Sequence, residues 1–254
     1  MRDRFKIQNV GISITDLNDA VKLIMEQANS KTPAYVCVIN TRATYIGNHD
    51  PDYCRILNSS FLTVPDGKPI EWYAHASGLK QVKKTSGPDL FESICSTTQN
   101  EKYTHFLYGS TPEVIQKMKD NLLIKYPNLQ IVGAVSPPFG SPEELANDAI
   151  VKLINKLKPT FFWLGLGAPK QERVMDLFIK SIDSSILIGV GLVFDYQAGN
   201  VKRAPIWMQK AGMEGIYRLI QQPRRVNYRS LSVLFSIVPQ ILRILFIKKV
   251  YGKS

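Results

Sequence analysis

The feature that most constrains the fold is a regular alternation of short apolar runs with helix-like segments between residues 34 and 190. Each apolar run has the length of one buried strand, and the runs are Ala34–Ile39, Phe61–Val64, Thr104–Tyr108, Gln130–Val135, Thr160–Leu166 and Ser185–Val190. The helical patterns fall near residues 16–29, 51–58, 68–77, 88–99, 112–125, 142–157 and 170–181. Strands that alternate with helices favour a parallel sheet covered by helices on both faces. We therefore expect an α/β fold with a largely parallel sheet flanked by helices.

Three of the expected helices have clear start signals. Asp50-Pro51 and Thr111-Pro112 each place a capping residue before a proline at the first helical position. Ser141-Pro142-Glu143-Glu144 has the spacing of a capping box, because Glu144 follows the serine by three residues.

The positive charge of the chain is concentrated at one end. Of its 32 Lys and Arg residues, eleven lie between Val201 and Ser254, where Glu214 is the one acid. The first 200 residues hold 21 basic and 20 acidic residues and are nearly neutral. A segregated basic segment predicts an anionic partner, such as nucleic acid, anionic lipid or a phosphate-bearing substrate.

The cysteines and the first residues bear on the cellular compartment. Cys37, Cys54 and Cys95 lie in unrelated segments without CxxC spacing, which favours reduced thiols over a disulfide framework or a zinc site. The opening residues MRDRFKIQNV lack the apolar core of a signal peptide. Both features predict a cytoplasmic protein.

Small or polar residues follow five of the six expected strands. They are Asn40-Thr41, Asp66-Gly67, Gly109-Ser110-Thr111, Gly165-Leu166-Gly167 and Gly189-Val190-Gly191. Ligands of open, Rossmann-like α/β sheets bind beyond the carboxyl ends of the strands, where glycines allow close approach and helix N-termini face phosphate. The pattern favours a nucleotide or sugar-phosphate cleft. A nicotinamide site is disfavoured, because Lys170 and Phe194 stand where a dinucleotide fingerprint has its third glycine, and no Walker A motif is present.

Several longer strings together resemble one known family. They are VPDG and SGPDL, then GLGAPKQE from Gly165, then GVGLVFDYQAGNVKRAPIWMQKAGMEGIYRLIQQPRR from Gly189. From Asn40 to Arg229 the chain resembles the WecG/TagA/CpsF family of bacterial glycosyltransferases. It departs from the family pattern at Lys84, where arginine is usual, at Gly215, which replaces a tryptophan, and at Val38-Ile39, where some members have a threonine-containing pair.

The resemblance implies an inverting transfer of a sugar, often N-acetylmannosamine, from a UDP-sugar donor. The implied acceptor is a sugar on an undecaprenyl-diphosphate lipid at the inner face of the cytoplasmic membrane, in the synthesis of teichoic acid or another surface polysaccharide. Members of the family work without a bound metal, so no cofactor is expected. Asp50-Pro51-Asp52 has the DxD spacing that metal-dependent transferases use, but helix capping accounts for both acids.

The resemblance also implies the site residues. Asp66 matches the family's base, which takes a proton from the acceptor hydroxyl; Pro65-Asp66-Gly67 is alternatively a simple turn. Gln171 is expected to contact nucleotide or sugar, or else to cap its helix. Asn40 and Asp195 are expected to orient substrate hydroxyls, although Asp195 is alternatively a buried structural acid. Without a metal, helix N-termini and cations must meet the diphosphate, and the expected binding residues are Asn40, Lys84, Gly109, Gly165, Gly167, Lys170, Gln171, Gly191, Asp195, Arg203, Arg218, Arg224 and Arg225.

The C-terminal segment predicts attachment to a membrane surface. From Leu231 the chain reads LSVLFSIVPQILRILFIKKVYGKS, in which Pro239, Gln240 and Arg243 interrupt an apolar run too short for a span. On a helix the polar residues form a narrow stripe opposite a wide apolar face, as in helices that lie in a membrane interface.

We expect residues 1–200 to form the catalytic domain, either as one unit or as two lobes that meet near residue 100. Residues 201–254 are expected to form a basic, amphipathic helical appendage for diphosphate and membrane contact. A helix buried in a homo-oligomer interface is the alternative.

Three other functions stay open at this point. The same fold can transfer glucose or another UDP-hexose. The pI near 9.5 is compatible with a nucleic-acid-binding protein, although such proteins usually spread their basic and aromatic residues along one groove or face. A non-catalytic membrane-binding scaffold is the third, and the presence of both Asp66 and Gln171 argues against it. We expect a UDP-sugar and a lipid-linked acceptor as partners, and no nucleic acid.

Overall fold

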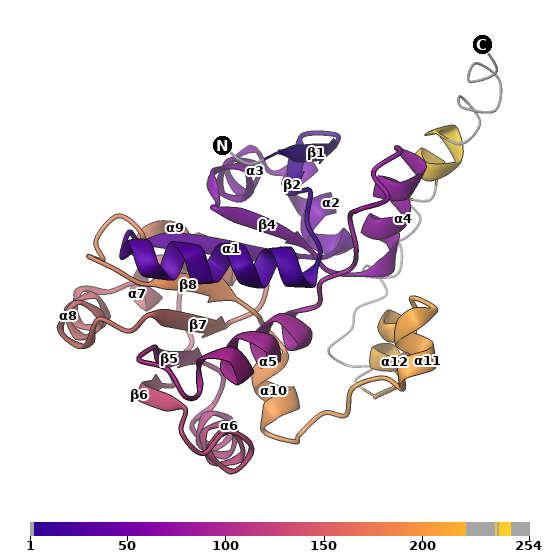
Figure 1. Cartoon of the computed structure of the whole chain (residues 1–254). Coiled ribbons are helices and arrows are strands. Elements are labelled where there is room, and N and C mark those ends of the chain that lie inside the picture. The colour runs from indigo at the N-terminus through magenta and orange to yellow at the C-terminus, as the bar shows by residue number, and fades with distance from the viewer. Residues whose placement is uncertain (1–2, 222–236, 238, 245–254) are drawn as a thin grey trace.

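A six-stranded parallel sheet lies between two layers of helices in the computed structural model, which describes residues 3–221, 237 and 239–244 (Figure 1). The strand order across the sheet is β4-β3-β8-β7-β5-β6, and every neighbouring pair is parallel. The strands are β3 (Ala34–Ile39), β4 (Leu62–Pro65), β5 (Thr104–Gly109), β6 (Gln130–Val135), β7 (Phe161–Gly165) and β8 (Ile186–Gly189). A separate antiparallel hairpin consists of β1 (Arg4–Ile7) and β2 (Val10–Ser13).

The helices connect these strands and continue beyond the last one. Those before β7 are α1 (Leu17–Ser30), α2 (Thr41–His49), α3 (Pro51–Ser59), α4 (Lys68–Ala76), α5 (Gly87–Thr98), α6 (Pro112–Lys125), α7 (Pro142–Leu145) and α8 (Asp148–Leu157). The later ones are α9 (Lys170–Phe178), α10 (Val193–Gln197), α11 (Ile206–Lys210) and α12 (Glu214–Gln221).

The core has two halves, one on each face of the sheet. On one face, Val36 packs in a cluster with Ile24 of α1 and Phe91 of α5. On the other, Cys37 packs with Tyr53 of α3 and Phe178 of α9. Because successive residues of a strand point to opposite faces, a strand covered on both sides must be apolar throughout. This requirement explains why the strands are apolar runs and why their positions are readable from the sequence.

The structure confirms the α/β fold and all six expected strands, and corrects one helix. The pattern over residues 142–157 forms two helices, because Asn147 interrupts it and caps α8 by accepting a hydrogen bond from Ile150 N at 3.2 Å. Asp50 caps α3 as expected, accepting from Tyr53 N at 2.9 Å. The capping box at Ser141 is also present.

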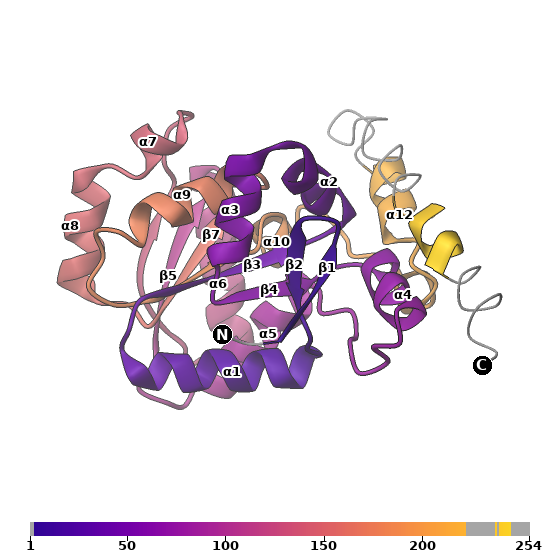
Figure 2. The ribbon, with the colours of Figure 1, turned by 90° about the horizontal axis from the view of Figure 1, so that it is seen from above.

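The described helical segments beyond residue 200 lie beside α4 (Figure 2). Figures 1 and 2 show α11, α12 and residues 239–244 near this helix, at one end of the molecule. Gly212, between α11 and α12, approaches α4 so closely that a Cβ on it would lie 3.0 Å from the Trp72 ring. Ile237 is buried and packs in the same cluster as Ile7 and Ala74. The rest of the expected tail helix lies outside the described residues. Within the described ranges, no helix combines the length and the apolar character needed to cross a bilayer.

Candidate functional site

Asp66 stands directly after β4, at the edge of the sheet where the strands' carboxyl ends meet, here called the carboxyl edge. Its backbone N–H donates to Ile39 O at the end of β3, with a distance of 2.8 Å. On the other side of the strand, Thr85 N donates to Pro65 O, also at 2.8 Å. These two bonds hold Asp66 between the end of β3 and the segment that leads into α5. The fold thus fixes the backbone at the position expected for the base.

The charges around Asp66 come from distant parts of the chain. Burial raises the pKa of Asp66 to about 6, and Arg218, Lys84 and Arg203 oppose this shift while Glu214 adds to it. Because charges act strongly only over short distances in a protein, these four residues lie near the carboxylate. We call Asp66, Lys84, Asp89, Arg203, Glu214 and Arg218 the ionic cluster.

Arg203 links α5 to α12 within the ionic cluster. Its guanidinium donates to both carboxylate oxygens of Asp89 at 2.5 and 2.8 Å and to Ser86 Oγ at 2.8 Å. Its Nε lies 3.7 Å from Glu214 Oε1. Burial opposes ionisation of Asp89, but the hydrogen bonds from Arg203 and Ser86 hold the pKa of this acid below its usual value. The bidentate geometry is the one that arginine forms with carboxylates and with phosphates.

Lys84 and Arg218 complete the cationic side of the ionic cluster. Lys84 Nζ hydrogen bonds to Glu214 Oε2, and its backbone N–H donates to Glu71 Oε2 at 2.7 Å. Arg218 donates to the hydroxyl of Tyr196 at 3.4 Å. Its Nε is buried and has no hydrogen-bond partner among the described residues. The structure thus brings Lys84, Arg203 and Arg218, all expected from the sequence, to one place beside Asp66.

The glycines expected at the site end or follow β5, β7 and β8 along the carboxyl edge. Gly109 pairs with Gly165 in the sheet and has a φ of 138°. A Cβ on Gly109 would lie 2.7 Å from the backbone of Gly165, so only glycine fits there. Gly167 and Gly191 also have positive φ values, of 78° and 54°. Close packing against Gly165 explains the need for glycine at position 109. It does not explain Gly167, because a Cβ on that residue would meet nothing within 4 Å.

Gln171 and Lys170 are placed at the start of α9. The Gln171 side chain is only 3 % exposed; it accepts from Gly167 N at 3.1 Å and donates to Glu172 Oε1 at 2.9 Å. It thereby ties the loop after β7 to α9. Lys170 Nζ donates to Gly140 O at 2.9 Å, in the loop after β6. The substrate contacts of Lys170 and Gln171 stay predictions.

The remaining expected residues fall into two groups. Asn40 follows β3 and is exposed, and its side-chain oxygen caps α2 by accepting from Ala43 N at 3.1 Å. Asp195 is half-buried in the first turn of α10, and its carbonyl accepts from Asn200 N at 3.0 Å. Arg224 and Arg225, like Arg229, lie outside the described residues.

The acids of the DxD string are paired with an arginine. Arg173 of α9 donates to Asp50 Oδ2 at 2.5 Å and to Asp52 Oδ2 at 2.7 Å. Asp50 also caps α3. Among the described residues there is no group of three or more His, Cys, Asp or Glu side chains that could hold a metal ion. Asp50 thus caps α3 as expected, and both acids of the string also form an inter-helix ion pair with Arg173.

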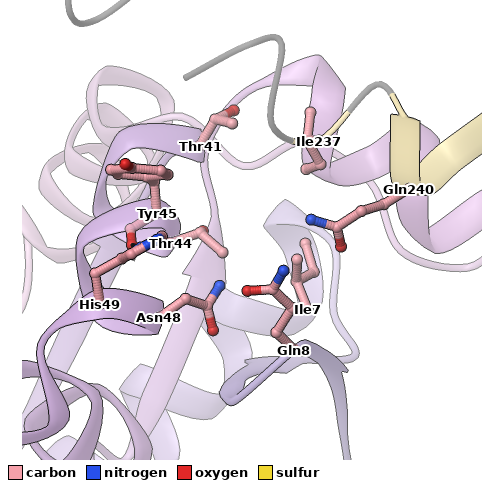
Figure 3. Close-up of a pocket in the computed structure, with 9 residues that line it drawn as sticks. All are labelled: Ile7, Gln8, Thr41, Thr44, Tyr45, Asn48, His49, Ile237 and Gln240. Atoms are coloured by element: carbon pink, nitrogen blue, oxygen red, sulfur yellow. Dashed lines mark hydrogen bonds between the residues drawn. The ribbon is translucent and has the colours of Figure 1, made fainter. Parts of the chain in front are cut away.

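A cavity of about 250 Å³ lies between α2, the turn of the β1–β2 hairpin and the C-terminal segment (Figure 3). Figure 3 shows the side-chain amides of Gln8, Asn48 and Gln240 directed toward one another, with Ile237 above them. The cavity does not include Asp66 or any cation of the ionic cluster. Ile237 and Gln240 line it together with Thr41 and Thr44, so this part of the C-terminal segment lies close to the start of α2.

Three residues of the site are not indicated by the sequence patterns. Asp89 belongs to the SGPDL string, which carries the family resemblance without an expected role for this acid. Glu214 and Tyr196 lie in the string from Gly189 that carries the family resemblance, again without an expected role, and Glu214 is also the one acid of the basic segment. An isolated acid within a run of bases is a signal that an ion pair is present, but its partner Lys84 is 130 residues away in the chain.

The comparisons with known proteins identify the family of this chain. The sequence model of the WecG/TagA/CpsF family of glycosyl transferases matches residues 5–250. A protein of Bacillus subtilis (strain 168), named N-acetylglucosaminyldiphosphoundecaprenol N-acetyl-beta-D-mannosaminyltransferase, is 30% identical over 205 residues, which is 81% of this chain and 78% of the relative. A protein of the same name from Bacillus spizizenii is 26% identical over 200 residues, which is 79% of this chain and 76% of the relative.

These matches favour a transferase over a nucleic-acid-binding protein or a non-catalytic scaffold. The family match covers almost the whole chain, including the ionic cluster and all the strands of the sheet. The chain belongs to the WecG/TagA/CpsF family of glycosyl transferases and is a glycosyltransferase.

Proposed function

We propose that this glycosyltransferase moves N-acetylmannosamine from a UDP donor to the N-acetylglucosamine of a lipid-linked diphosphate acceptor, with Asp66 as the base. The names of both relatives support the transferred sugar and the acceptor. The observation that carries the proposal is the carboxylate of Asp66, whose pKa is raised to about 6 beside three cations at the carboxyl edge. A base with a pKa near the working pH is well suited to accept a proton during the reaction.

In the proposed reaction, one displacement inverts the configuration at the anomeric carbon. The acceptor hydroxyl oxygen attacks this carbon, and its proton passes to the carboxylate of Asp66. The bond from the anomeric carbon to the donor phosphate breaks, and UDP leaves with the electron pair. Since negative charge grows on the leaving diphosphate, cations that are already in place stabilise the transition state.

Lys84, Arg203 and Arg218 are the cations that would meet the diphosphate. The Nε atoms of Arg203 and Arg218 are buried and lack a hydrogen-bond partner within the described ranges. Buried donors are almost always paired in proteins, so an unpaired one indicates a ligand position. Two such donors beside Asp66 suit the oxygens of a diphosphate.

The surface around α4, α11 and α12 supports work at a membrane. Its exposed large apolar residues, which we call the apolar rim, are Trp72, Ile206, Trp207, Ile216, Ile220 and Leu242. Figures 1 and 2 place these elements together, and the exposed bases Lys80, Lys210 and Arg243 lie on or next to them. Tryptophan at an interface, with nearby bases for anionic headgroups, is typical of proteins that bind a membrane surface. We propose that the apolar rim rests on the cytoplasmic face of the membrane that holds the acceptor.

Release of UDP by the purified protein tests the proposed reaction. The assay offers a panel of UDP-sugars with a lipid-diphosphate-linked N-acetylglucosamine, with and without EDTA, to the wild type and to Asp66→Asn. We expect release with UDP-N-acetylmannosamine only when the acceptor is present, unchanged by EDTA. Asp66→Asn should lower the rate by roughly a hundredfold to ten-thousandfold, the usual contribution of a general base.

Two results would contradict parts of the proposal separately. Full activity of Asp66→Asn would remove Asp66 from the role of base and leave the transfer itself in place. Faster release from UDP-glucose or another UDP-hexose would change the donor and keep the mechanism. Asp148→Asn is the matched control, because Asp148 is an exposed acid at the start of α8, away from the ionic cluster.

A further inference from the structure

Glu214 occupies the position in the ionic cluster that an anionic ligand needs. Its carboxylate hydrogen bonds to Lys84 Nζ through Oε2 and lies 3.7 Å from Arg203 Nε through Oε1. Its charge also raises the pKa of Asp66, so it lies near the base. Lys84 and Arg203 are two of the three cations proposed for the diphosphate.

The charges of the ionic cluster are balanced without any ligand. Asp66, Asp89 and Glu214 supply three acids, against the three bases Lys84, Arg203 and Arg218. A diphosphate that entered this arrangement would add negative charge to a neutral site and would face Glu214 at close range. Like charges at such distances repel each other strongly inside a protein.

The contacts of Glu214 are weaker on the arginine side than on the lysine side. Arg203 Nε makes no hydrogen bond among the described residues, although Glu214 is its nearby acid. Asp89, by contrast, accepts from Arg203 at 2.5 and 2.8 Å. Glu214 therefore neutralises Arg203 without accepting a hydrogen bond from its Nε, and the side chain of Glu214 is one quarter exposed. An anion with more oxygens would pair better with both cations.

We infer that Glu214 is an internal competitor of the substrate diphosphate, which holds Lys84 and Arg203 in the ligand-free enzyme and is displaced when a diphosphate binds. The inference rests on the proposed function and adds a residue that sets the affinity of its site. Glu214 lies in the first turn of α12, and Arg218 is one turn further along the same helix. Displacement of Glu214 would therefore shift the helix that also carries Arg218, so diphosphate binding and the position of Arg218 are coupled.

Calorimetric titration of the full chain with UDP tests the inference. The variants are Glu214→Gln, which keeps the shape and removes the charge, and the control Glu143→Gln, which alters an exposed acid of α7 at the far end of the molecule. We expect Glu214→Gln to bind UDP about tenfold more tightly than the wild type, as the loss of a competing charge permits. Glu143→Gln should bind UDP like the wild type. Unchanged or weaker binding by Glu214→Gln would overturn the inference for the donor.

A second ligand distinguishes the two possible sources of the diphosphate. Donor and lipid-linked acceptor both carry this group, so the titration is repeated with farnesyl diphosphate. If Glu214→Gln binds only UDP more tightly than the wild type does, the competition is with the donor. If it binds only farnesyl diphosphate more tightly, the competition is with the acceptor. A gain with neither overturns the inference as a whole.

A third variant and the transfer assay separate other causes of failure. If Glu214→Gln does not fold, Glu214→Asp keeps the charge but shortens its reach, and should also tighten binding, by a smaller factor. If the wild type transfers sugar while neither variant binds a diphosphate more tightly, the inference is wrong and the proposed function stands. If the wild type neither transfers sugar nor binds UDP, the proposed function fails, and the inference fails with it.

Discussion

At the scale of single residues, the backbone and the side chain of Asp66 are controlled by different interactions. Its backbone is fixed by hydrogen bonds on both sides of β4. The pKa of its carboxylate is set by burial and by the charges around it. A carboxylate that was fully paired would have a low pKa and would be a poor base. Burial instead raises the pKa of Asp66 to about 6.

The first residue-scale prediction concerns the pH dependence of the reaction. Because Asp66 must be deprotonated to act as a base, kcat/KM should fall about tenfold per pH unit below about pH 6 and level off above it. The measurement is the rate of UDP release at low substrate concentration between about pH 4.5 and about pH 8. A profile that stays flat across this range would contradict the raised pKa of this carboxyl group.

The second residue-scale prediction concerns the stability of the free enzyme. An acid whose pKa rises from 3.8 to about 6 on folding binds its proton more tightly in the folded state. The folded state therefore loses stability as the pH rises through this window, and the full loss persists above it. Asp66→Asn should raise the free energy of unfolding at about pH 7 by about 1–2 kcal/mol, a range that is lowered to allow for screening of the charge by solvent. Near about pH 3 the substitution should not raise the free energy of unfolding. Urea denaturation at the two pH values measures the difference, and an equal gain at both would point to another cause.

At the scale of elements, the first turn of α5 is the point where two parts of the chain meet. Ser86 caps this helix, and Asp89 in its first turn binds Arg203, more than one hundred residues later. An acid at a helix N-terminus is already favoured by the helix dipole. Here the same acid also holds the segment that leads into α11 and α12, and so holds Glu214 and Arg218 near Asp66.

Asp89→Ala should therefore affect the enzyme more than a helix-capping change alone. We expect the transfer rate to fall roughly tenfold to a hundredfold, since Arg203 and α12 lose their anchor and small misplacements are costly. The free energy of unfolding should fall by about 1–2 kcal/mol, because a charged hydrogen-bond pair is broken at a partly exposed site. The assay of UDP release and urea denaturation check the two effects. Asp148→Ala, at the start of α8, is the control; an equal loss of activity in both variants would contradict the role of Asp89.

At the scale of the whole molecule, the apolar rim and the ionic cluster share the same elements. Gly212 packs on α4, and the α11–α12 segment that carries Trp207 also carries Glu214 and Arg218. A membrane against the apolar rim would therefore hold its lipid-linked sugar close to Asp66.

Binding to vesicles tests this arrangement. Trp207→Glu should lower co-sedimentation with vesicles of anionic lipid at least about tenfold, because a charge replaces an aromatic residue at the interface. Activity on a soluble, short-chain acceptor should change little. Phe139→Glu is the control, because Phe139 is also an exposed aromatic residue but lies in the loop after β6. Equal vesicle binding by both variants would contradict the proposed membrane surface.

The sheet, its parallel character and most helix starts are readable from the sequence alone. Buried strands must be apolar on both faces, and capping residues act on their nearest neighbours, so both signals are local. The family strings also indicate Asp66, Lys84, Arg203 and Arg218. The break at Asn147 escapes prediction because the apolar pattern continues across it. The β1–β2 hairpin escapes because neither of its strands, RFKI and VGIS, is a continuous apolar run like those of the buried sheet.

Which charges meet depends on the tertiary structure. Glu214 pairs with Lys84 and Arg203 with Asp89 across more than one hundred residues, and no local pattern encodes a contact over such a distance. The strand order brings the ends of β3 and β4 together, and the packing of α11 and α12 beside α4 brings the bases to Asp66. The physical reason is that a pKa and an ion pair depend on distances in space, which the order of residues along the chain does not contain.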